Sequence, residues 1–184
     1  MSVIDELLSA NEKYLANPPV DYTNEDHHAS KLPKKKLAIV TCMDTRLVNF
    51  LEPALGLERG DVKMIKVVGN VVTGVFDSVI KSLMVAIYEL GVEEIAVIGH
   101  EECGMAKTTS ESLTKAMLER GVSADAIKMV EKELKDWADA FKEPKQNVLD
   151  AVEAIRNNPL IPKDVGVHGL VFHPRTGKLT SIVE

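Results

Sequence analysis

The sequence predicts an α/β fold in which a mainly parallel central sheet is flanked by helices. Short apolar runs alternate with longer stretches that carry apolar residues at helical spacing, which is the pattern of parallel strands joined by helices. Hydrophobic residues make up 45% of the 184 residues, but aromatic residues make up only 4%. A core built mainly from Val, Ile, Leu and Ala suits strands that are buried on both faces.

Five short apolar runs are expected to be strands, and the last two are expected to form a hairpin. Thr176-Gly177 predicts the turn of that hairpin, because it separates two strand-like runs with a dipeptide that favours tight turns. The expected strands cover residues 37–41, 63–68, 95–98, 165–172 and 179–183.

Helices are expected between these strands and near the start of the chain. Their expected ranges are 3–16, 77–90, 123 to about 141 and 144 to about 157. The first is amphipathic, and Asn17-Pro18-Pro19 ends it. We therefore expect an N-terminal helical arm and tether over residues 1–36 and an α/β domain over residues 37–184, which together make one structural domain.

Composition and charge argue against several classes of function. The net charge is -6 and no basic face is evident, so nucleic acid is not an expected partner. No apolar run approaches the roughly 20 residues that span a bilayer, and residues 1–16 lack the pattern of a signal peptide. We expect a cytoplasmic protein with no membrane partner. In a reducing compartment, its two cysteines indicate metal binding or catalysis before a disulfide.

Both cysteines follow expected strands. Cys42 comes directly after the first strand, and His100 and Cys103 follow the third. Ligands of parallel sheets bind at the carboxyl ends of the strands, and a spacing of three residues is about one helical turn, so all three side chains are able to reach one ion. Two thiolates and one imidazole suit zinc, and three protein ligands leave a fourth position open for catalysis. Spacing alone leaves an alternative, in which the cysteines are buried apolar residues and the histidine is structural.

The residues next to Cys42 favour a catalytic site. In the run Cys42-Met43-Asp44-Thr45-Arg46, the guanidinium of Arg46 is able to clamp the carboxylate of Asp44 in a two-pronged pair. Such a pair keeps Asp44 ionised and oriented. The alternative is an ordinary ion pair at the start of a helix.

Together, Cys42-x-Asp44-x-Arg46 and His100-x-x-Cys103 resemble the paired signature of β-class carbonic anhydrases, and the run from His100 to Met105 resembles their short prokaryotic branch. The resemblance covers residues 37 to 179. It implies one catalytic zinc per chain on Cys42, His100 and Cys103, and reversible hydration of carbon dioxide to bicarbonate and a proton by zinc-activated water. Asp44 would orient that water, and Arg46 would keep Asp44 off the metal. The resemblance also implies a homodimer or a multiple of dimers. The N-terminal helix over residues 1–16 would then lie over the partner subunit, and the alternative is that it packs on its own domain.

One segment departs from the family pattern. Members usually carry Arg-Asn-Ala-Gly after the second strand, whereas this chain has Lys66-Val67-Val68-Gly69-Asn70. That segment borders the active site in the family. Two alternatives to carbon dioxide hydration therefore stay open: a hydrolase of carbonyl sulfide or carbon disulfide on the same scaffold, and a zinc-binding relative without catalytic activity.

Overall fold

A computed structural model describes residues 2–18, 30–141 and 143–183. The chain divides into two compact units, Met1–Lys31 and Leu32–Glu184. Most of the expected tether, from residue 20 to residue 29, lies outside the described residues. The assignment of residues 1–36 as an arm stays a prediction.

The first unit contributes helix α1 (Val3–Ala16), as the apolar spacing predicts. Ser2 caps the helix: its hydroxyl accepts a hydrogen bond from the backbone N–H of Asp5, and the Asp5 carboxylate accepts one from the N–H of Ser2. The apolar side chains of the helix are largely exposed, with Leu7 60% and Leu8 61% accessible to solvent. No residue of α1 is buried, so no described residue of its own unit covers this apolar stripe.

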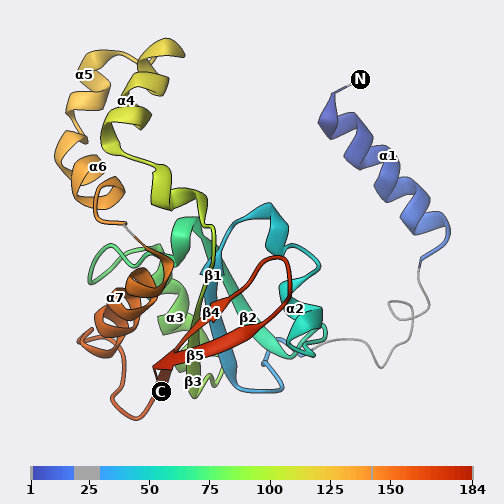
Figure 1. Ribbon diagram of the computed structural model, residues 1–184. Coiled ribbons are helices and arrows are strands. Elements are labelled where there is room, and N and C mark those ends of the chain that lie inside the picture. The colour runs from blue at the N-terminus through green and yellow to red at the C-terminus, as the bar shows by residue number, and fades with distance from the viewer. Residues whose placement is uncertain (1, 19–29, 142, 184) are drawn as a thin grey trace. The chain divides into compact units, whose positions relative to one another are not determined.

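The second unit is built around one five-stranded sheet in the order β2-β1-β3-β4-β5 (Figure 1). All neighbouring strands run parallel except β5, which runs antiparallel to β4 across the expected hairpin. Gly177 has φ +72° in that hairpin, a value that favours Gly. The strands are β1 (Leu37–Cys42), β2 (Val62–Val67), β3 (Glu94–His100), β4 (Gly166–Phe172) and β5 (Leu179–Val183). The predicted mainly parallel α/β architecture is confirmed.

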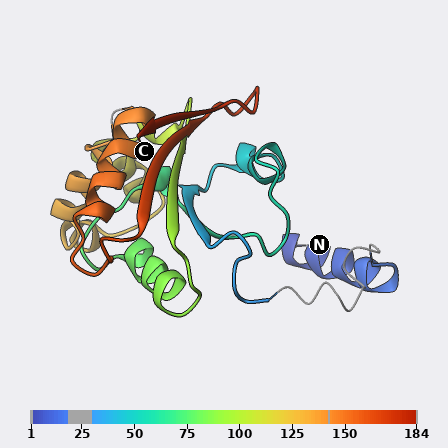
Figure 2. The same ribbon diagram turned by 90° about the horizontal axis from the view of Figure 1, so that it is seen from below.

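Helices cover both faces of this sheet. Alternate residues of β1 separate the two cores: Ala38 and Val40 pack with α3 (Ser78–Tyr88) and α7 (Pro144–Arg156), whereas Ile39 packs on the other side. The other side includes Leu51 of the short helix α2 (Leu51–Ala54). Figure 2 shows α3 and α7 on the same side of the sheet and α2 on the opposite side.

The region between β3 and α7 contains more and shorter helices than the sequence predicts. We expected one helix from residue 123 to about 141, but the structure has α5 (Ala124–Lys128) and α6 (Glu131–Ala138). The break falls at Val130, whose φ of −119° and ψ of 9° lie outside the helical region. Val is β-branched and is a weaker helix former than its neighbours. The sequence reading also missed α4 (Ser110–Glu119).

A glycine allows α7 to lie against the end of β3. A Cβ on Gly99 would come within 2.5 Å of Val148 Cγ2, a contact that real structures do not show. The next residue along the strand is His100. Close packing of α7 therefore fixes the end of β3, which carries the candidate ligand His100.

Among the described residues, no helix is both long and apolar enough to cross a membrane.

Candidate metal centre

Three side chains that could hold a metal ion converge at the carboxyl ends of two adjacent strands. Cys42 is the last residue of β1 and His100 is the last residue of β3, and these strands pair directly. Cys103 follows His100 through a turn, and its sulfur lies 3.9 Å from that of Cys42. The ligand atoms of all three residues lie within 4.8 Å of one another. Each residue is at most 5% exposed, so this is a buried cluster and not a chance gathering of surface groups.

The turn after β3 differs from the helical turn that we expected. Glu102 adopts φ +55°, and Cys103 is the N-cap of a 3-10 helix, η5 (Gly104–Lys107). His100 and Cys103 therefore face the same point because a tight turn reverses the chain between them. The expectation of helical spacing was wrong, although the side chains do converge.

One nitrogen of His100 is left ready to bind a ligand. The Nδ1 atom lies 2.9 Å from the backbone carbonyl oxygen of Glu101, which has no proton to give, so Nδ1 is the donor. The Nε2 atom is then unprotonated in the neutral ring. It is buried and finds no hydrogen-bond partner among the described residues. Buried polar atoms are usually satisfied, so this nitrogen fits a metal ligand. With two sulfurs beside it, the donor set fits zinc.

The contact between the two sulfurs changes the pKa of each thiol. The pKa of Cys42 is lowered, chiefly because the thiol of Cys103 donates to it, and the N–H of Gly69 also donates to this sulfur at 3.3 Å. The same contact raises the pKa of Cys103. The pair therefore gives up its first proton more readily than its second. A dipositive ion would favour loss of the second proton.

Asp44 and Arg46 form the expected two-pronged pair. Arg46 donates from Nε to Asp44 Oδ1 at 3.0 Å and from Nη2 to Oδ2 at 2.8 Å. These bonds lower the pKa of Asp44 to about 2. Asp44 is also the N-cap of a 3-10 helix, η3 (Thr45–Leu47), so the pair has the local capping role that we considered as an alternative. Its Oδ2 nevertheless lies 3.7 Å from His100 Nε2, beside the candidate ligands.

Glu102 and Arg175 join this pair to another part of the fold. Arg46 Nη2 donates to the backbone carbonyl of Glu102 at 2.9 Å, and Arg175 from the β4–β5 hairpin donates to both carboxylate oxygens at 3.0 Å. Arg175 is 73 residues away in the chain, and no spacing pattern signals the contact.

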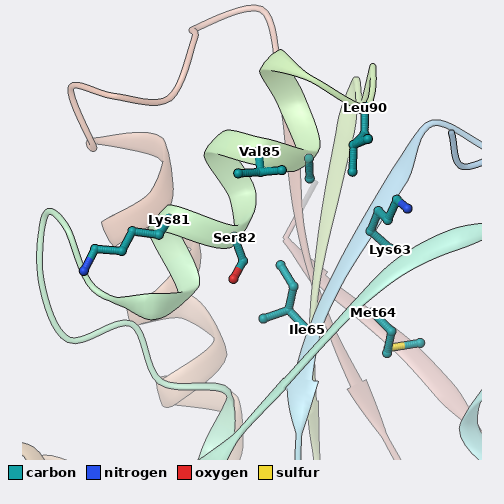
Figure 3. Close-up of a pocket in the computed structure, with 8 residues that line it drawn as sticks. Lys63, Met64, Ile65, Lys81, Ser82, Val85 and Leu90 are labelled. Atoms are coloured by element: carbon teal, nitrogen blue, oxygen red, sulfur yellow. The ribbon is translucent and has the colours of Figure 1, made fainter. Parts of the chain in front are cut away.

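A hollow on the described surface lies away from these candidate ligands. A pocket of about 500 Å³ opens between β2 and α3, where Figure 3 shows Ile65, Lys81, Ser82 and Val85 along its wall. It contains none of the candidate ligands. We assign the site from the convergent buried donors, because chemistry and not the size of a hollow selects a metal.

Comparison with known proteins identifies the family. A family model described as "Carbonic anhydrase" matches residues 37–179. The crystal structure of β-carbonic anhydrase isoform I from Trichomonas vaginalis superimposes with a TM-score of 0.92 at 44% sequence identity, covering 100% of this chain and 99% of that chain. The Bacillus subtilis protein named "Putative carbonic anhydrase YtiB" is 41% identical over 186 residues, 100% of this chain and 97% of that protein.

A relative with another named activity is also similar. The carbon disulfide hydrolase of Acidithiobacillus thiooxidans is 32% identical over 156 residues, which are 79% of this chain and 76% of that protein. The match to the family model nevertheless spans strands β1 to β4 and every candidate site residue. The chain belongs to the β-class carbonic anhydrase family.

Proposed function

We propose that this protein catalyses the reversible hydration of carbon dioxide to bicarbonate and a proton, as a zinc-dependent carbonate dehydratase. Cys42, His100 and Cys103 would hold the zinc. The observation that carries the proposal is the buried set of two sulfurs and one nitrogen, which has no hydrogen-bond partner among the residues that the structure describes, with an oriented carboxylate beside it. When bound, zinc would supply a Lewis acid that lowers the pKa of a water molecule far below its bulk value.

The side chains near this centre would orient the reacting water. Asp44 stays ionised because Arg46 holds its pKa at about 2, so its carboxylate can only accept a hydrogen bond from the water. Accepting that bond directs a lone pair of the water oxygen toward carbon dioxide. Arg46 occupies both carboxylate oxygens and is itself bonded to the Glu102 carbonyl, which restrains Asp44 from swinging onto the metal.

The segment Lys66–Asn70 differs from the usual family pattern, so carbon disulfide or carbonyl sulfide stays a second candidate substrate. Lys66 is turned to Glu52, with Nζ 2.7 Å from Oε1, so it does not replace a polar group in the site. Val68 and Val71 pack instead with the cluster that contains Cys42 and Cys103. Carbon dioxide and carbon disulfide are both apolar, so this apolar wall accommodates either of them, and a carbon disulfide hydrolase is among the similar proteins.

A direct assay separates the candidates. Zinc-loaded protein of known metal content would be mixed with carbon dioxide, and proton release would be followed in a stopped-flow instrument with a pH indicator. Parallel samples would receive carbon disulfide or carbonyl sulfide, and released sulfide would be measured. We expect hydration of carbon dioxide to dominate. Dominant sulfide release would support the second candidate, and inactivity toward all three substrates would support a non-catalytic zinc-binding relative.

We also propose that the protein assembles as a homodimer or a multiple of dimers through α1. The support is the apolar stripe of that helix, in which Ile4 is 62% and Leu15 67% exposed. Exposed apolar surface of this kind marks an interaction site. Deleting residues 1–16 is expected to shift the protein toward monomer or aggregate in light scattering. Replacing the polar Glu12 by Ala in the same helix is the control, and an unchanged assembly and solubility after the deletion would contradict the proposal.

A cytoplasmic location is part of the same proposal. Cys42 and Cys103 are free cysteines with sulfurs 3.9 Å apart, and a reducing compartment would keep them available as metal ligands. Cell fractionation with an antibody to the protein tests this location.

A further inference from the structure

The sulfur of Cys42 receives a backbone hydrogen bond from a neighbouring loop. Directly after β2, residues Val68–Asn70 form a 3-10 turn, η4, in which Gly69 has φ +59°. Its buried N–H points at Cys42 Sγ at 3.3 Å. A Cβ at Gly69 would lie 3.1 Å from Phe141 and 3.2 Å from Met105, so side chains press closely on this turn. The N–H of Gly69 is therefore held by close packing, and a small shift of the turn would move it away from the sulfur of Cys42.

A side chain from α7 binds the backbone carbonyl group of Gly69. Asn147 donates from Nδ2 to the backbone carbonyl oxygen of Gly69 at 2.5 Å, and the Asn147 side chain is partly buried. The helix is fixed against the sheet at the next residue, Val148, which packs against Gly99 of β3. An unbroken series of contacts therefore runs from α7 through Asn147 and Gly69 to Cys42.

We propose that Asn147 is a positioning residue that keeps the N–H of Gly69 on the sulfur of Cys42 and so tunes a metal bound there. A hydrogen bond to a thiolate withdraws electron density from the sulfur, and groups that contact ligands in this way adjust the metal. Two thiolates make a zinc ion a weak Lewis acid, and this bond offsets part of that effect. The inference rests on the proposed metal centre, but it does not require that carbon dioxide is the substrate.

The test uses the full chain loaded with cobalt in place of zinc. Cobalt bound by thiolates gives sulfur-to-metal charge-transfer absorption, whose energy falls as the sulfur becomes richer in electrons. Asn147→Asp removes the donor and places a carboxylate against the Gly69 carbonyl. Asn147→Leu removes the donor without adding charge. We expect both variants to shift the charge-transfer band to longer wavelength, and to speed hydrogen exchange at the Gly69 amide.

Asn158→Leu is the matched control. Asn158 also donates from Nδ2 to a backbone carbonyl in the loop after β2, that of Val75 at 3.0 Å, and it is 4% exposed. Its loss should lower stability without moving the cobalt band. An unmoved band in the cobalt-loaded Asn147 variants, or an equal shift in Asn158→Leu, would overturn the inference. These readouts do not involve turnover, so an inactive wild type that still shows the shifts would reject the proposed reaction and leave the inference intact.

Discussion

Replacing Cys42 with Ser, His100 with Ala or Cys103 with Ser is expected to lower the bound zinc from about one ion per chain to nearly none, and to abolish hydration of carbon dioxide. Each change removes one of the three buried donors that the described part of the chain places within 4.8 Å of one another. With two donors left, the protein would compete poorly with water for the ion. Elemental analysis of purified protein and a stopped-flow assay on the same samples measure both losses.

His168→Ala is the control for these variants. His168 lies in β4, and its Nε2 is 3.5 Å from a carboxylate oxygen of Glu94, away from the candidate centre. This variant should keep the zinc and the activity of the unchanged protein. Circular dichroism would show whether each ligand variant still folds. Folded Cys42, His100 or Cys103 variants that retain full zinc would show that the ligand assignment is wrong.

Replacing Asp44 with Ala is expected to leave zinc bound and to reduce hydration by about 10- to 1000-fold, the range of positioning and acid–base effects. The three donors are untouched, but the water loses the acceptor that orients it. Because the pKa of Asp44 is held at about 2, the carboxylate is ionised at every pH of the assay, and the loss should be similar across that range. A pH–rate profile beside the measured zinc content is the test.

Arg46→Ala should give a different profile. Without the guanidinium, the pKa of Asp44 rises toward its ordinary value, yet the group stays a carboxylate near neutral pH and is free to bind the metal. Activity should fall most at low pH and recover in part at high pH, where hydroxide competes for the ion. Arg175→Ala is the control, since this exposed arginine contacts Glu102 but not Asp44, and such surface pairs contribute about 0–1 kcal/mol. Full activity of Asp44→Ala at every pH would refute the orienting role.

The sequence predicts those parts of the fold that follow from local patterns. Each strand is a short apolar run whose burial does not depend on distant details, and all five strands begin and end within two residues of the expected positions. The convergence of Cys42 with His100 was also predictable, because residues at the carboxyl ends of paired parallel strands share one edge.

Other features depend on backbone conformation and long-range contacts that no spacing encodes. The left-handed turn at Glu102 is unusual for a non-glycine residue, and nothing in the residues around it signals it. Asn147 meets Gly69 across 78 residues of sequence, and either residue alone has an ordinary explanation, as a helix residue or a turn glycine. The helix break at Val130 was missed for a related reason, because apolar periodicity continues across it.

The placement of the donors on two separate strands links metal binding to folding. Cys42 and Cys103 are 61 residues apart in the chain, so the unfolded chain does not present the donor set. Metal therefore binds the native state in preference to the unfolded one, and free metal at a hundredfold above its dissociation constant would add about 2.7 kcal/mol to the free energy of unfolding. The apparent thermal stability of this protein is thus a property of its metal supply as well as of its core.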